Sequence, residues 1–268
     1  MAIGDFDDLS NSIANKTQLF KYMKSFASQA IGQFYACHFA PGLPGAPTYP
    51  TPGVNGVAVD NSTSGAWDFT NPTGGDISYL SHLDGSSTAT AGTFYLYDRL
   101  WHNSGLSTTT VGAQSISPAA LTRYTSGEGV EAWFDVLGTA MGSGATAPSI
   151  SYTDQAGNTG NTATAQGWVT TAAINRCFPF ALAAGDTGVR SIQSFNNNAS
   201  HTSGAFGLVL RKRLATFTVP LAGSGPDPLD FFDLGGPQIF DDACLEFLWQ
   251  PAATTASILM MSAGITQG

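Results

Sequence analysis

The stretch FYLYDRLWH, residues 94–102, decides the expected fold class of this chain. Bulky side chains stand at successive positions, so both faces of an extended segment would be apolar. A strand inside a β-sandwich, or one at a subunit contact, has this pattern. A competing interpretation is an exposed aromatic platform that stacks against sugars. We expect most of the tryptophan rings to fill core space instead, and these rings are Trp67, Trp101, Trp133, Trp168 and Trp249.

Short β-like runs separated by turn-rich segments continue from Gly53 onward. No helical period and no fixed-period repeat interrupts them. A series of strands without intervening helices indicates an antiparallel sandwich. We therefore expect a mainly β protein with a jelly-roll-like antiparallel β-sandwich domain over residues 54–268. The expected strands are Ile77–Leu83, Thr93–Asp98, Val130–Leu137, Ser149–Thr153, Gly167–Ala173, Val189–Phe195, Ala205–Arg211, Ala215–Leu221, Ile239–Trp249 and Ser257–Ser262.

The apolar residues between Leu19 and Phe34 recur at spacings of three and four, which predicts an amphipathic helix. Asn15 and Gln18 resemble a capping box at its start. Such a helix either packs on its own domain or forms an arm that lies in a neighbour's groove. We expect residues 1–40 to be this helical arm. Its expected interface residues are Leu19, Phe20, Met23, Phe26, Ile31 and Phe34.

Proline stands at every third position from Pro41 to Pro50. This period matches the three-residue turn of the polyproline II helix, so we expect residues 41–53 to be a semi-rigid, proline-rich linker. The linker would separate the N-terminal helix from the β domain.

Only 11% of the residues are charged, and the formal net charge is −9. Ordinary soluble domains have about a quarter of their residues charged. The basic residues form no stripe, so we expect no direct binding to nucleic acid. The single basic run, Arg211–Arg213, is typical of a solvated strand edge. We find no secretory signal and no apolar run long enough to span a bilayer, so we expect no membrane partner.

Cys37, Cys177 and Cys244 are widely spaced and lie among apolar neighbours. This pattern indicates buried free thiols made in a reducing compartment.

Motifs of common catalytic and cofactor sites are absent from the sequence. No lysine follows a glycine, and the zinc-protease, dithiol and serine-hydrolase signatures are missing, so we expect no enzyme, no cofactor and no metal. Glu128 and Glu131 could serve as the carboxylate pair of a glycosidase, but they flank an expected strand. The C-terminal aspartates could recruit a cation such as calcium, although we expect them to cap turns. We expect the histidines in turns or on strand surfaces. The C-terminal aspartates are Asp227, Asp230, Asp233, Asp241 and Asp242. The histidines are His38, His82, His102 and His201.

Several short segments of the sequence resemble segments of tailed-bacteriophage virion structural proteins. They are Asn71–Gly75, Leu96–Leu106, Arg123–Trp133, Ser151–Gly157 and Ala184–Ser191. The resemblance covers roughly residues 65–210 and includes no catalytic signature. The N-terminal segment, the proline-rich linker and the acidic C-terminal region lie outside it.

The resemblance implies a non-enzymatic component of a virion that is made and assembled in the cytoplasm of the host bacterium. Accessory shell proteins of such particles are often β-sandwiches. The expected role is therefore a capsid decoration or cement protein that binds the major capsid protein or another virion protein. We expect a symmetric homo-oligomer, with a trimer favoured. Two alternatives stay open, a tail or head fibre adhesin that recognises host glycans and a glycan-cleaving enzyme built on a β-sandwich.

Overall fold

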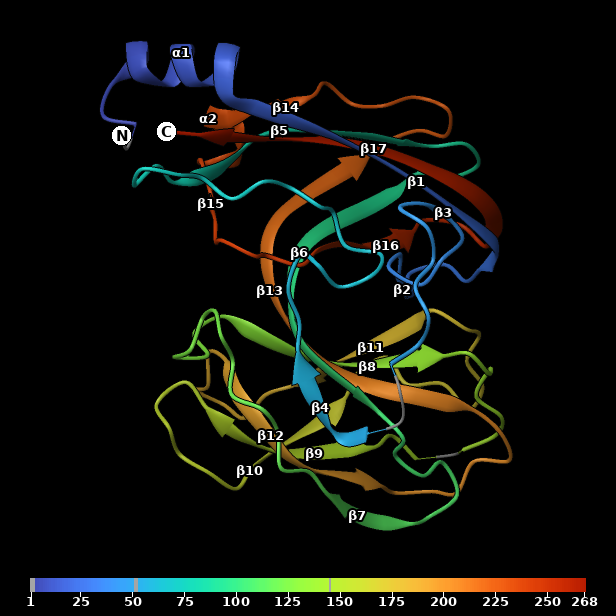
Figure 1. The fold of residues 1–268 in the computed structure, drawn as a ribbon. Coiled ribbons are helices and arrows are strands. Elements are labelled where there is room, and N and C mark those ends of the chain that lie inside the picture. Colours follow the sequence, from blue (N-terminus) through green and yellow to red (C-terminus); the bar gives the residue numbers. More distant parts are fainter. Residues whose placement is uncertain (1–2, 51–52, 145) are drawn as a thin grey trace.

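The computed structural model describes residues 3–50, 53–144 and 146–268 (Figure 1). It is mainly β, with 49% strand and 6% helix, and its sheets are antiparallel, which confirms the expected class. The elements are α1 (Phe6–Lys16), β1 (Thr17–Gln29), β2 (Phe34–Ala36), β3 (Gly42–Leu43), β4 (Gly53–Ala58), β5 (Ser78–Ser87), β6 (Gly92–Ser104), β7 (Gly112–Ser115), β8 (Val130–Leu137), β9 (Ser149–Asp154), β10 (Asn161–Ala165), β11 (Arg176–Ala181), β12 (Val189–Asn197), β13 (Ala205–Val219), β14 (Leu229–Asp230), α2 (Phe231–Leu234), β15 (Gln238–Ile239), β16 (Leu245–Pro251) and β17 (Thr255–Gln267).

Six strands close into a barrel. Neighbouring strands follow the order β2, β16, β6, β13, β8 and β11, and β11 pairs back to β2 at Tyr35 and Phe34. Successive side chains of each strand therefore point alternately into the barrel and out of it. A closed barrel is not the arrangement that we expected, and the jelly-roll sandwich is not confirmed.

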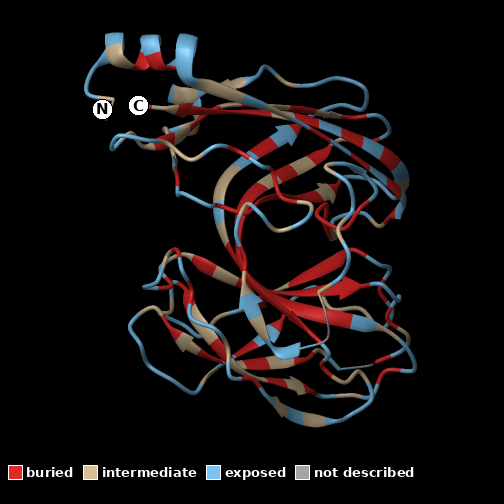
Figure 2. Cartoon of the chain, in the orientation of Figure 1, coloured by how far each residue is buried: buried red, intermediate tan, exposed pale blue. Residues whose placement is uncertain are grey.

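The strands β6 and β13 are long and bent, and they run through both the upper and the lower part of the molecule (Figure 1). In the upper part, a second sheet has the order β14, β5, β17, β1, β3 and packs against outward-facing residues of β6, β13 and β16. In the lower part, β11 continues into β10, β9, β12 and β7, which enclose another apolar core together with β8 and β13. Figure 2 shows buried residues on the strands of both parts.

Most of the expected strands coincide with observed ones, and Val130–Leu137 has the same bounds as β8. The expected strands Ala205–Arg211 and Ala215–Leu221 form one strand, β13, because an irregularity in its pairing with β6 after Arg213 lets the strand continue. The segment Gly167–Ala173 is not a strand.

The amphipathic helix expected over Leu19–Phe34 is wrong, because most of this segment belongs to strand β1. β1 pairs with β17 along its length, and its side chains alternate between core and solvent. Tyr22, Lys24 and Phe26 face the core and are buried. The spacing of three and four arose because apolar residues occur on both faces of the strand, while the buried Lys24 interrupts its two-residue period.

The N-terminal helix, α1, is short and lies before this segment. Asp5 caps it, since its carboxylate accepts a hydrogen bond from the Asp8 N–H at 2.9 Å. Asn15 therefore lies in the last turn of α1 and does not begin a helix.

The proline-rich segment lies against the upper sheet. Gly42–Leu43 forms β3, which pairs with β1. The buried Lys24 ammonium donates a hydrogen bond to the Pro44 carbonyl at 2.7 Å, which attaches the segment to the sheet. Of the linker expected over residues 41–53, residues 51–52 lie outside the described residues.

Candidate functional site

The interior of the barrel holds four charged side chains. Arg99 of β6, Asp135 of β8, Arg211 of β13 and Glu246 of β16 are each at most 1% exposed. The Arg99 Nη1 lies 3.1 Å from Glu246 Oε2, and the Arg211 Nη1 donates to Asp135 Oδ1 at 2.9 Å. Each arginine also contacts the other carboxylate. The network balances two charges of each sign and connects four of the six barrel strands.

We expected Arg211–Arg213 to lie on a solvated strand edge. This prediction is wrong for Arg211, because β13 pairs with β6 on one side and with β8 on the other. Burial alone would raise the pKa of Glu246, but Arg211 and Arg99 outweigh burial and hold that pKa below its ordinary value. These charges neutralise one another inside a closed barrel, so we assign the network a structural role.

Glu128 and Glu131 form hydrogen bonds with different parts of the molecule. The Glu131 Oε2 accepts hydrogen bonds from the Tyr97 hydroxyl at 2.9 Å and from the Trp133 indole at 3.1 Å. Glu128 instead accepts a hydrogen bond from the Thr187 hydroxyl at 2.8 Å. The two carboxylates therefore have separate partners and separate tasks.

Three of the histidines are more deeply buried than the sequence suggested. His38, His102 and His201 are each at most 7% exposed. His38 lies in a turn, as expected, whereas a strand-surface position is wrong for His102, which is buried on β6. Burial, helped by the adjacent Arg99, lowers the pKa of His102 to about 2, so this ring is neutral. Its Nδ1 accepts a hydrogen bond from the Arg99 Nε at 3.1 Å.

The three cysteines are buried free thiols, as expected. Burial raises the pKa of each thiol, which removes the thiolate that a nucleophile or a metal ligand needs. Asp230 caps α2 by accepting hydrogen bonds from the N–H groups of Phe232 and Asp233, so this aspartate has the expected turn-capping role. Within residues 3–50, 53–144 and 146–268, no three His, Cys, Asp or Glu side chains are grouped so that they could hold a metal ion.

The tryptophans do not form an exposed sugar platform. Trp67, Trp101, Trp133 and Trp249 are at most 3% exposed, and Trp168 packs against the lower core. The core-filling role expected for most of these rings is therefore confirmed.

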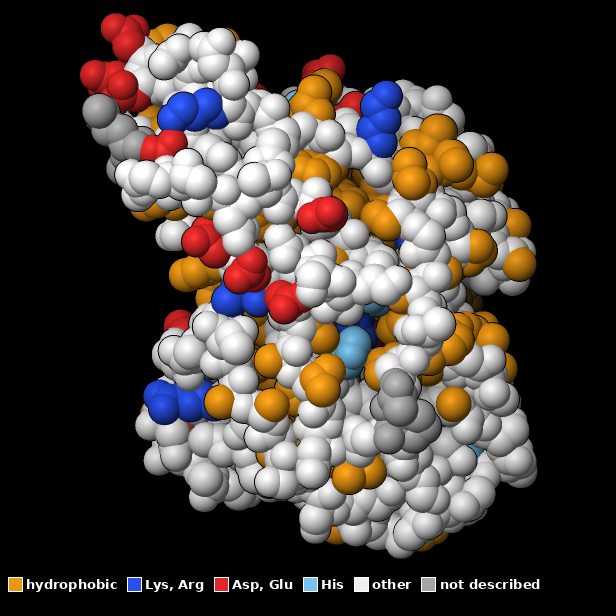
Figure 3. Space-filling model, in the orientation of Figure 1, with side chains coloured by type: hydrophobic (Ala, Val, Ile, Leu, Met, Phe, Trp, Pro, Cys, Tyr) orange, Lys and Arg blue, Asp and Glu red, His pale blue; other side chains and the backbone are white. Residues whose placement is uncertain are grey.

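The outer surface of the upper sheet carries exposed apolar side chains. Leu19 and Met23 of β1 are 72% and 48% exposed, and Ile258 and Met260 of β17 are 43% and 42% exposed. Leu43 of β3 continues the row, because it lies opposite Met23, which in turn lies opposite Met260. We call these five residues the apolar face. Figure 3 shows hydrophobic side chains gathered over the region of β1 and β3.

A shallow groove of about 370 Å³ crosses the apolar face. Met23, Leu43 and Met260 line it together with the charged side chains of Lys21 and Asp84. Contiguous exposed apolar patches are typical of surfaces that contact a protein, a membrane or a ligand.

Of the six interface residues expected from the sequence, three lie on the outer surface and three lie inside the molecule. Leu19 and Met23 belong to the apolar face, and Ile31 is exposed after β1. The other three pack inside the molecule, where Phe20 stacks on Trp67, Phe26 contacts Tyr35, and Phe34 contacts Trp133. Sequence reasoning missed Leu43, Ile258 and Met260, which come from other parts of the chain.

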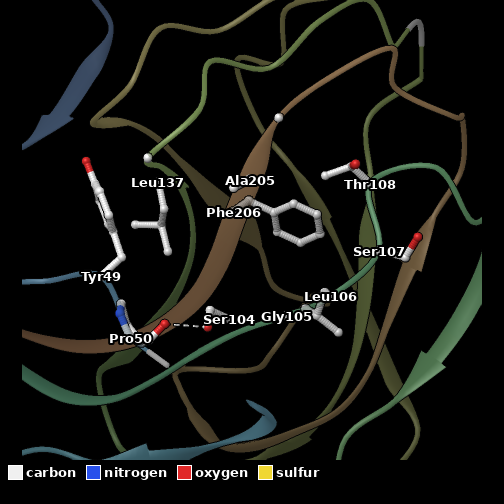
Figure 4. Close-up of a pocket in the computed structure, with 12 residues that line it drawn as sticks. Tyr49, Pro50, Ser104, Gly105, Leu106, Ser107, Thr108, Leu137, Ala205 and Phe206 are labelled. Carbon is white, nitrogen blue, oxygen red and sulfur yellow. Dashed lines mark hydrogen bonds between the residues drawn. The ribbon is translucent and has the colours of Figure 1, made fainter. Parts of the chain in front are cut away.

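A second cavity, of about 670 Å³, lies where the ends of β6 and β8 meet the start of β13 (Figure 4). The side chains of Leu106, Leu137 and Phe206 line it, and none of the described residues in its lining is charged. Tyr49 stands at its edge with 39% of its surface exposed. A neutral lining with two aromatic rings, those of Tyr49 and Phe206, suits an uncharged ligand.

Comparison with known proteins places the chain in no family. No protein-family model matches it, and no curated protein is similar enough in sequence to count as a relative. In the described part of the chain, neither helix is long and apolar enough to cross a membrane.

Proposed function

We propose that this chain is a non-enzymatic structural component of a bacteriophage virion, a decoration or cement protein that binds the major capsid protein or another virion protein and acts as a homo-oligomer. The observation that carries the proposal is the apolar face. Leu19, Met23, Leu43, Ile258 and Met260 are exposed in the single chain and need a partner. The resemblance of residues 65–210 to virion proteins supports the same role.

The barrel also supports this role. Its interior is filled by packed side chains and by a closed ion network, an arrangement that holds a fixed shape. A shell protein has to present such a rigid surface to a lattice.

The proposal is tested by counting copies of the chain in purified phage particles with quantitative mass spectrometry. A decoration protein should be present in hundreds of copies, and a fibre protein in a few to a few tens. The double variant Met23→Ser, Met260→Ser should reduce incorporation. Val111→Ser is the matched control, because Val111 is 61% exposed but lies outside the apolar face. Absence of the chain from particles would refute the proposal.

The uncharged cavity favours a second candidate function, a fibre adhesin that binds a host glycan. Sugars stack their apolar face on aromatic rings, and Tyr49 offers such a ring at the cavity edge. Glycan-array binding that is lost in Tyr49→Ala, together with a low copy number in particles, would favour this adhesin over a shell protein.

A further inference from the structure

Among the described residues, the groove across the apolar face is lined by one positive and one negative side chain, placed symmetrically about β17, the middle strand of the upper sheet. Lys21 on β1 lies opposite Ser262 on β17, and Ser262 lies opposite Asp84 on β5. All three residues line the groove on the outer side of the sheet. Lys21 and Asp84 are therefore two strand spacings apart, about 10 Å. Among the described residues neither forms an ion pair, so both charges are available to a partner.

This arrangement is complementary to itself. A twofold axis that lies above Ser262 and runs along β17 exchanges the two sides of the sheet. Lys21 of each copy then stands over Asp84 of the other, which makes two ion pairs at once. We infer that the apolar face binds a second copy of this chain around this axis. The inference rests on the proposed function, which gives the face a partner, and it names that partner.

The side chains along the axis suit close packing of two sheets. Sheets that pack face to face lie about 10 Å apart with interdigitated side chains. The axis brings Met260 of each copy against Met260 of the other. It also places each Met23 over Ser86, because Met23, Met260 and Ser86 share one register line. Flexible methionines fill irregular gaps, and the small Ser86 and Ser262 leave room for them.

The charge pattern selects a pair of copies and not the trimer expected from the sequence. A twofold contact uses the same surface on both copies, whereas a ring of three needs two different complementary surfaces. Lys21 and Asp84 stand on opposite sides of Ser262, so this one surface is complementary to a second copy of itself, as a twofold contact requires.

The test exchanges the two charges in separate variants of the full-length protein. In Lys21→Glu, and equally in Asp84→Lys, the paired positions carry like charges in both contacts of the dimer. Each variant alone should dimerise at least about tenfold more weakly than the wild-type protein, because like charges across an interface repel. A mixture of the two variants restores opposite charges in both contacts of the heterodimer. Dimers should therefore return on mixing.

Sedimentation equilibrium measures the dimer dissociation constant of each sample. Asp241→Lys is the matched control, because it makes the same charge change at an exposed residue outside the face and should leave dimerisation unchanged. Thermal unfolding of each variant checks that the fold is intact. Recovery on mixing is the decisive readout, since an effect inside one chain would persist in the mixture.

The inference is overturned if the wild-type protein stays monomeric, if it forms trimers, or if mixing restores no dimer. These outcomes differ from a failure of the proposed function. A chain that is monomeric in solution but present in hundreds of copies per particle would contradict the inference alone. A chain that forms the dimer but is absent from particles would contradict the proposed function alone.

Discussion

Replacing Arg211 by Met should destabilise the protein far more than replacing Arg213 by Met. The two arginines lie on the same strand, two residues apart, and both face the barrel interior or its mouth. Arg211 is fully buried, whereas the Arg213 side chain is 51% exposed. The two substitutions remove the same group from two different environments.

The magnitude follows from what each substitution leaves behind. Without Arg211, Asp135 and Glu246 share the single cation of Arg99, whose Nη1 lies 3.5 Å and 3.1 Å from them. Removing one partner from a buried ion pair costs about 3–5 kcal/mol, because a charge remains buried and uncompensated. The Arg213 pair with Glu131, at 3.3 Å, is partly solvated. Loss of such an exposed pair costs less than about 1 kcal/mol.

Equilibrium unfolding in urea measures both changes. The slope of the unfolding free energy against urea concentration should be the same in all three proteins, so that a shift in the urea midpoint reports a change in stability.

The size of the Arg211→Met effect should depend on pH. The lowered pKa of Glu246 stabilises the folded state at pH values above the ordinary pKa of glutamate, and this stabilisation is lost as the pH falls through the pKa of Glu246 in the folded protein. The gap between wild type and Arg211→Met should therefore narrow on acidification. If Arg211→Met costs no more than Arg213→Met, the network does not hold the barrel together.

Three further predictions concern other buried or paired groups. The three cysteines should not react with a thiol reagent at pH 8 in the native protein, because burial raises the pKa of each thiol, and all three should react after unfolding. Burial lowers the pKa of Lys24 to about 8 from the ordinary 10.5. Between these two pH values, Lys24 is mostly protonated in the unfolded chain and mostly neutral in the folded protein. Urea unfolding should therefore show wild-type stability rising with pH across this window relative to Lys24→Met. The double variant Glu128→Gln, Glu131→Gln should still assemble into particles, and a loss of infectivity together with a glycan-cleaving activity would contradict the structural role.

The strand at residues 94–102 was predictable because its pattern has a simple physical cause. Phe94 and Leu96 pack in the upper core, while Tyr95 and Tyr97 belong to the cluster inside the barrel. A barrel strand covered by a second sheet has two apolar faces, and two apolar faces are visible in the sequence.

The N-terminal strand was not predictable in the same way. Lys24 occupies a core position, and no sequence rule expects a lysine there. Its ammonium is accommodated by carbonyls of Ala40 and Pro44, which the fold brings back to β1. The helical period looked convincing only because this lysine concealed the alternation of the strand.

The ion network and the apolar face depend on contacts between distant parts of the chain. Arg211 forms hydrogen-bonded ion pairs with Asp135, which is 76 residues away in the sequence, and with Glu246, which is 35 residues away. The apolar face joins β1 to Met260, near the other end of the chain. A charged run or a lone methionine carries no sign of such a partner, so these features emerge only when the strands pair.

Nearly a third of the charged residues of this protein lie inside the fold. Of its 10 basic and 19 acidic residues, nine are buried, including the four of the barrel network. The other 20 charged residues leave the surface about as poor in charge as the sequence as a whole. Charged side chains keep protein surfaces apart in solution, and exposed edges or faces without them pair readily. Among the described residues that line the groove, Lys21 and Asp84 are the charged ones, and they are placed to meet each other across a copy of the same face. The fold thus places balanced charges inside the barrel and leaves one charge of each sign beside the exposed apolar side chains of the outer sheet, the arrangement from which we inferred the dimer.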